Sequence, residues 1–113
     1  MPAGSIIQEG AVLTPAQNNT VYTVPAGLQA VFSTIMIVNN DGSQRDVRVA
    51  IAAGDTPTAA EWITPQTLPI PANDANPITA GLTAAAGDRI VAWCETGADV
   101  VVRVFGRLET APG

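Results

Sequence analysis

Apolar and polar residues alternate with a period of two in two segments of this chain. In residues 99–109 most even positions are apolar, whereas the odd positions include Arg103 and Arg107. Residues 46–52 alternate in the same way. Because the side chains of a strand point to opposite faces in turn, both segments predict strands with one buried face. Phe105 falls on the polar side of its strand, so we expect that side to be partly covered.

A longer segment is apolar on both faces. Residues 29–38 are rich in β-branched side chains, which favours a central strand covered on both sides over the alternative of a buried helix. Asn, Asp, Gly and Ser follow this segment, and these residues favour tight turns. We therefore expect residues 39–45 to close a hairpin between strands 29–38 and 46–52.

Further strands are predicted wherever a short apolar segment lies between turn signals. These segments are residues 5–13, 20–24, 67–71, 77–83 and 89–96. Pro69 and Pro71 confine one of them to a sheet edge, because proline has no N–H to donate to a neighbouring strand. Residues 53–66 contain two prolines and predict mainly a long loop, with room for one helical turn.

About eight short strands in 113 residues predict an all-β fold, a single antiparallel β-sandwich. A jelly roll and an immunoglobulin-like Greek key both fit this pattern. The chain has one cysteine, so the Cys…Trp…Cys framework of immunoglobulin domains is missing, which favours the jelly roll. We expect one domain over residues 1–113, in which residues 1–13 are a candidate N-terminal arm.

The charge balance excludes several classes of partner. Five arginines stand against ten acidic residues, and the net charge is −5. Nucleic-acid affinity depends on basic side chains that neutralise phosphates, so we expect no nucleic-acid partner. Anionic lipid is an equally poor match, and no apolar segment is long enough to span a membrane. The first residues also lack the basic start and apolar segment of a secretory signal.

The residue types that most enzymes need are missing. The chain has no histidine and no lysine, which removes the commonest general base, the serine triad, Schiff-base chemistry and a ligand set for zinc. Cys94 lacks a base to activate it, so we interpret it as a small buried core residue, with a disulfide between subunits as the alternative. The acidic loops do not have the spacing of a calcium site. We expect no enzymatic activity, no metal and no cofactor.

Two tryptophans are candidates for an interface. Trp93 lies in a predicted strand, which favours a place in the core or between subunits. Trp62 lies in the proline-flanked loop, where an exposed aromatic side chain anchors an interface or stacks on a sugar; the alternative is that it folds back and plugs one end of the sandwich. Arg45 and Arg107 complete the predicted interface, because arginine and tryptophan are both enriched at binding hot spots.

Two segments resemble a known class of protein. Residues 22–27 read Tyr-Thr-Val-Pro-Ala-Gly and lead into an apolar strand that ends Ile-Val-Asn-Asn, and residues 81–90 read Gly-Leu-Thr-Ala-Ala-Ala-Gly-Asp-Arg-Ile. This layout covers roughly residues 12–109. It resembles small β-sandwich virion proteins of tailed bacteriophages, which occur as capsid decoration (cement) proteins and in tail-fibre or baseplate modules.

The resemblance implies a non-enzymatic structural role on the virion capsid surface, after assembly in the bacterial host cytoplasm. Decoration proteins of this kind bind the outside of the lattice of the major capsid protein, often as homotrimers, and stabilise the shell. We therefore expect self-association through an apolar sheet face, with loops and residues 1–13 gripping capsid subunits. The alternative is a tail-fibre or baseplate module that binds a host receptor or glycan. Such a module would leave a concave polar and aromatic patch open.

Overall fold

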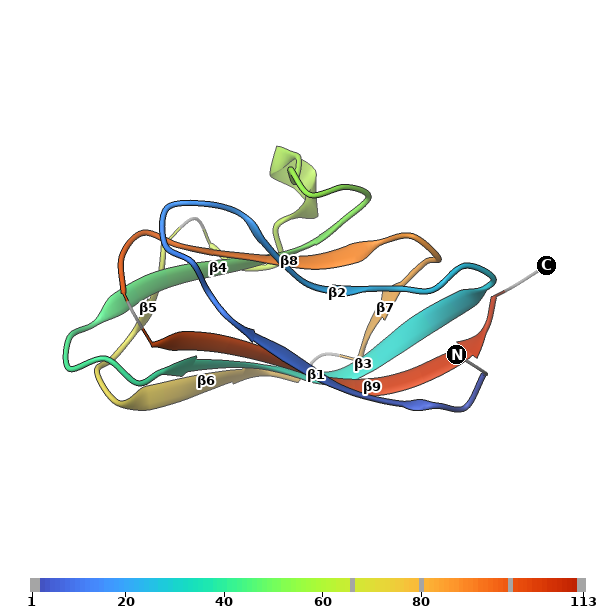
Figure 1. Ribbon diagram of the computed structural model, residues 1–113, viewed down its shortest axis with the longest axis horizontal. Helices are drawn as coiled ribbons and strands as arrows, with labels where there is room; N and C mark the ends of the chain where they lie inside the picture. The colour runs from blue at the N-terminus through green and yellow to red at the C-terminus, as the bar shows by residue number, and fades with distance from the viewer. Residues whose placement is uncertain (1–2, 66, 80, 98, 112–113) are drawn as a thin grey trace.

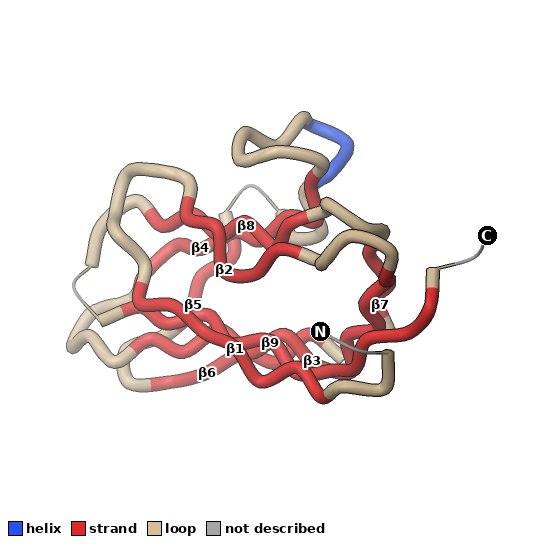
Figure 2. Tube along the Cα trace, turned by 45° about the vertical axis from the view of Figure 1, so that its right-hand side comes forward, coloured by secondary structure: helices blue, strands red, loops and turns tan. Residues whose placement is uncertain are grey.

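The computed structural model describes residues 3–65, 67–79, 81–97 and 99–111. In these residues two antiparallel sheets pack face to face, with the core between them (Figures 1 and 2). The elements are β1 (Ile6–Val12), β2 (Asn19–Thr23), β3 (Leu28–Asn39), β4 (Arg45–Ala52), the short 3-10 helix η1 (Ala59–Glu61), β5 (Leu68–Ile70), β6 (Asp74–Ile78), β7 (Leu82–Ala84), β8 (Arg89–Cys94) and β9 (Val100–Thr110). The predicted all-β sandwich is confirmed.

The order of the strands identifies the topology. Sheet A contains β1, β9, β3 and β6 in that order, with β7 also paired to β3, and sheet B contains β2, β8, β4 and β5. The pairs are nested along the chain: β1 with β9, β2 with β8, β3 with β6 and β7, and β4 with β5. Nested antiparallel pairs divided between two sheets in this way form a jelly roll. Of the two predicted topologies, this is the one favoured by the absence of the cysteine framework of immunoglobulin domains.

The hairpin predicted at residues 39–45 is wrong. β3 belongs to sheet A and β4 to sheet B, so the connection crosses from one sheet to the other. Asn39 ends β3 beside Val100 of β9, and Arg45 begins β4 beside Ile70 of β5. Turn-forming residues mark where the chain reverses, but they do not determine whether the returning strand stays in the same sheet.

The strand predicted over residues 77–83 is wrong in its extent, because the structure divides this segment between two strands. β6 ends at Ile78 and pairs with the second half of β3, whereas β7 begins at Leu82 and pairs with the first half. The two partners are separated where β3 bulges between Phe32 and Thr34. The remaining strands agree with the predicted bounds within two residues at each end.

β8 shows how alternation assigns side chains to the two faces. Ile90, Ala92 and Cys94 face the core, and Cys94 is fully buried, as predicted. Burial raises the pKa of the Cys94 thiol, and the nearby Asp41 carboxylate adds to this shift. Trp93 points the opposite way and is half-buried on the outer face of sheet B. Of the two predicted places for Trp93, the core is therefore wrong, and a place between subunits stays a prediction.

β3 is buried on one face only, which contradicts the prediction that it is covered on both sides. Its inward residues are buried, whereas Val31, Met36 and Val38 point outward from sheet A and are half-buried. On the neighbouring strand β9, the Phe105 ring centroid lies 5.1 Å from the guanidinium carbon of Arg103. The apolar outward residues of β3 therefore belong to an outer surface of the molecule.

The sheet edges are formed by short or proline-containing strands and by β1. All seven residues of β1 pair with β9, so residues 6–12 of the candidate N-terminal arm form the edge strand of sheet A in this chain. β5, which contains Pro69, lies at an edge of sheet B, as predicted. Residues 1–2, 66 and 80 of the predicted elements lie outside the described residues. None of the described residues forms a helix long and apolar enough to cross a membrane.

Candidate functional site

The outer face of sheet B carries an arginine that contacts two tryptophans. Arg48 of β4 and Trp93 of β8 are cross-strand neighbours, and both point away from the core. The Arg48 guanidinium carbon lies 4.4 Å from the centroid of the Trp62 ring and 4.9 Å from that of the Trp93 ring. Both distances fall within the range of cation–π interactions. We call these three residues the Trp–Arg–Trp cluster.

The loop between β4 and β5 carries Trp62 onto this face. The N–H of Ile63 donates to the Val49 carbonyl oxygen at 2.9 Å, and the N–H of Val49 donates to the Thr64 hydroxyl at 3.1 Å. Trp62 also forms an isolated antiparallel bridge with Ala50. Figure 1 shows the η1 segment of this loop on the side of sheet B that faces away from sheet A. Trp62 therefore folds back over the outer face of the sheet and does not plug one end of the sandwich.

A carboxylate holds this loop in shape. Glu61 of η1 accepts the N–H of Thr58 at 2.8 Å through one oxygen and the N–H of Ala53 at 2.9 Å through the other. These bonds favour the charged form of the carboxyl, so the pKa of Glu61 lies below its usual range, with the Thr58 N–H as the main cause. For the described part of residues 53–66, the prediction of mainly a long loop with room for one helical turn is confirmed, and η1 is that turn.

Two hollows adjoin Arg48 on the outer face of sheet B. The first, of about 200 Å³, is lined by Arg48 together with Asp46, Thr67, Trp93 and Glu95. The second, of about 360 Å³, is lined by Arg48 together with Ala59, Trp62 and Thr64. The guanidinium is thus shared by two concave surfaces, each with one tryptophan in its wall.

Two polar atoms at these hollows are buried without a partner. Asp46 Oδ1 and Arg48 Nε have no hydrogen bond to any other described residue. The ion pairs among the described residues join Arg45 to Asp41 and Arg107 to Glu109, so Arg48 belongs to neither. Both atoms are covered by neighbouring protein atoms, so each adds a desolvation cost on this face of sheet B.

The outer face of sheet A carries a row of apolar side chains, in contrast to the charged and aromatic side chains on the outer face of sheet B. Four cross-strand neighbours form an apolar row across β1, β9, β3 and β6: Val12, Val101, Val38 and Ala75. Val12 is 62% exposed, and Ile6, at the other end of β1, is 70% exposed. Farther along this face, a shallow hollow of about 310 Å³ lies over Ile6, Phe105 and Arg107, among others. Because the core lies on the other side of sheet A, this valine row faces outward.

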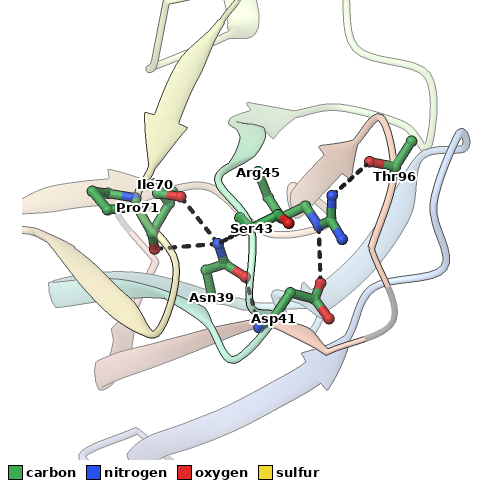
Figure 3. A network of polar contacts seen from close by, with 7 residues as sticks. All are labelled: Asn39, Asp41, Ser43, Arg45, Ile70, Pro71 and Thr96. Atoms are coloured by element: carbon green, nitrogen blue, oxygen red, sulfur yellow. Dashed lines mark hydrogen bonds and ion pairs between the residues drawn. The ribbon is translucent and has the colours of Figure 1, made fainter.

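Arg45 lies at one end of the sandwich in a network of loop contacts (Figure 3). Its Nε pairs with the Asp41 carboxylate at 3.1 Å, and its Nη1 donates to the Thr96 hydroxyl at 3.3 Å. Beside it, the fully buried Asn39 accepts the N–H of Asp41 at 2.9 Å. Through Nδ2, Asn39 donates to three carbonyl oxygens, those of Ser43, Ile70 and Pro71. The network ties the crossing between the two sheets to the chain that follows β5.

The structure gathers two of the four predicted interface residues. Trp62 and Trp93 meet at the cluster on sheet B, whereas Arg45 lies at one end of the sandwich and Arg107 on the outer face of sheet A, paired with Glu109 at 2.9 Å. The residue that joins the tryptophans, Arg48, was missed. Its alternation with buried valines predicts that it points outward, but its neighbours depend on strand pairing.

Among the described residues, no group of three or more Asp, Glu and Cys side chains could hold a metal ion. Comparison of the chain with protein-family models, with curated proteins and with solved structures finds no match. The function of this protein is therefore inferred from the chemistry of its two outer faces.

Proposed function

We propose that this chain is a non-enzymatic structural protein of a tailed-bacteriophage virion. It binds the outside of the lattice of the major capsid protein as a homo-oligomer, with a trimer favoured, and stabilises the shell. The observation that supports this proposal is the uncovered apolar face of sheet A. Jelly rolls occur in viral capsid proteins and in lectins, so the fold is compatible with the role without assigning it.

The valine row supports self-association through sheet A. Contiguous apolar surface on a soluble protein marks an interaction site, because covering it releases the water that it orders. Arg107 is exposed on the same face, and arginine is enriched in such interfaces. Within the described part of the chain, β1 pairs with β9 along one side only, and the other edge presents backbone groups to a neighbouring molecule.

A charge placed in the valine row tests the self-association. We expect Val101→Lys to convert the wild-type oligomer into a monomer in sedimentation equilibrium. The matched control is Thr20→Lys, at an exposed position of β2 in sheet B, which should leave the oligomer intact. Circular dichroism spectra equal to wild type would show that both variants are folded. A monomeric wild-type protein, or a Val101→Lys oligomer, would contradict assembly through this face.

The place of the protein on the virion is a separate test. Cryo-electron microscopy of virions from the source lysate should show density of this size at regular positions over the capsid lattice. Density only at the tail would instead support the second candidate function, a tail-fibre or baseplate module that binds a host receptor or glycan. The concave polar and aromatic surface at Arg48 favours this second candidate.

A further inference from the structure

The hollows beside Arg48 combine flat apolar surfaces with both donors and acceptors. Trp62 and Trp93 are half-buried, so part of each ring is open to solvent. The Arg48 guanidinium, which both rings contact, carries N–H donors on Nη1 and Nη2 in addition to the buried Nε. Asp46 and Glu95 line the first hollow, and carboxylates accept hydrogen bonds. Side chains that donate and side chains that accept hydrogen bonds therefore line the same small area.

The mixture of charges selects the class of ligand. An anion that approached Arg48 would also meet the carboxylates of Asp46 and Glu95, and a cation would meet the guanidinium. A neutral ligand with several hydroxyl groups avoids both conflicts, because each hydroxyl donates to a carboxylate and accepts from the guanidinium. A sugar ring has such hydroxyls around its rim and C–H groups on its face, which stack on an indole ring.

We propose that the Trp–Arg–Trp cluster is a binding site for a neutral carbohydrate. One sugar ring stacks on Trp62 in the larger hollow, whose volume of about 360 Å³ is at the low end for ligand pockets, roughly 300–1,000 Å³. A second ring reaches the hollow beside Trp93, where Asp46 and Glu95 accept its hydroxyls. Arg48 donates to both.

This site goes beyond the proposed role on the capsid. The cluster lies on the outer face of sheet B and the valine row on the outer face of sheet A, at opposite sides of the sandwich (Figure 2). A molecule that self-associates through sheet A therefore keeps the carbohydrate site on its opposite side, away from the contact between subunits. The two functions do not compete for the same surface.

Nuclear magnetic resonance tests the site directly, because the chain has two tryptophans and both belong to the cluster. The full chain labelled with nitrogen-15 is titrated with neutral oligosaccharides of glucose, galactose, mannose and N-acetylglucosamine at millimolar concentration. We expect both indole N–H signals to shift with at least one of these sugars. Inorganic phosphate serves as the anionic probe and should leave both signals in place.

Variants separate the site from the stability of the fold. Arg48→Met keeps an apolar side chain of similar length against the rings but removes the donors, and it should weaken sugar binding roughly tenfold or more. Trp62→Phe keeps a ring in the loop and should weaken it by a smaller factor. Arg103→Met is the matched control, because Arg103 also contacts an aromatic ring, that of Phe105, but on sheet A; its affinity should equal that of wild type.

Three results would overturn the proposal. The first is the absence of an indole shift with every sugar in the panel. The second is a shift with phosphate in place of sugar, which would make the site an anion site. The third is undiminished sugar binding by Arg48→Met, which would place binding elsewhere. None of these results bears on self-association through sheet A, which the Val101→Lys variant tests separately.

Discussion

Gly106 is the position at which one added methyl group should do most damage. It lies in β9 opposite Phe32 of β3, within the long central pair of sheet A. A Cβ atom at Gly106 would overlap the carbonyl oxygen of Val31 and would lie 2.9 Å from Phe32 Cα. These neighbours are backbone atoms, so they cannot turn aside as a flexible side chain does. We therefore predict that Gly106→Ala forces β3 and β9 apart.

The size of the effect follows from the geometry. Carbon atoms in ordinary contact are about 3.5–4.0 Å apart, so the two strands would have to separate locally by roughly 1 Å. Overpacking of this kind costs about 1–3 kcal/mol, and a stretched backbone hydrogen bond beside it adds about 1 kcal/mol. We expect a total loss of about 3 kcal/mol, or roughly 12 °C in Tm at about 4 °C per kcal/mol for a chain of this length.

Urea titration followed by circular dichroism measures this loss. The control is Gly42→Ala, because a Cβ atom at Gly42 meets no atom within 4 Å and the backbone there is not left-handed. We expect the control to stay within about 0.5 kcal/mol of wild type, as surface substitutions do. Alanine is intrinsically better than glycine in a strand, so a Gly106→Ala protein as stable as the control would refute the steric argument.

Three other side chains, those of Asn39, Cys94 and Glu61, allow further tests of the structure. Asn39→Ala leaves three carbonyl oxygens and one N–H without their partner, and it should cost about 2 kcal/mol in urea titration; no loss would show that these bonds are dispensable. Cys94 should resist iodoacetamide in the folded protein, because burial excludes the reagent and raises the thiol pKa; fast alkylation without denaturant would contradict its burial. Glu61 should titrate below the usual glutamate value of about 4.3 in a carbon-13 NMR experiment. The stability that it contributes is present above that value and is lost as the pH falls through the lower folded pKa, so Glu61→Gln should lack this part of the acid dependence; an unchanged acid profile would count against it.

The positions of the strands, apart from β6 and β7, could be predicted from the chain, but not their partners. The period-two alternation of valines and isoleucines reports which side of a strand faces the core, and it does so equally well for any neighbour. Asn39 shows the limit. The turn residues after it fit a hairpin within one sheet, whereas its side chain bonds to the carbonyls of Ile70 and Pro71, far along the chain, and helps to hold a crossing between the two sheets.

Only part of the candidate site could be predicted, because its geometry also depends on which strands pair. Trp62 stood out because it lies in a loop between prolines, and Trp93 because it is an aromatic residue in a predicted strand. That Arg48 joins them depends on β4 pairing with β8 in one particular register and on the loop that returns to Val49. Val31, Met36 and Val38 are apolar, and we therefore predicted that they are buried. Apolar side chains do not specify, however, whether the surface that covers them comes from the same chain or from another.

The place of β9 in sheet A decides when the molecule can fold during synthesis. β9 lies between β1 and β3 and pairs with both, although it is the last of the nine strands along the described chain. Until the ribosome has released β9, β1 has no partner within its sheet and the long strand β3 lacks one side. We therefore expect chains that end before β9 to stay unfolded and open to proteases.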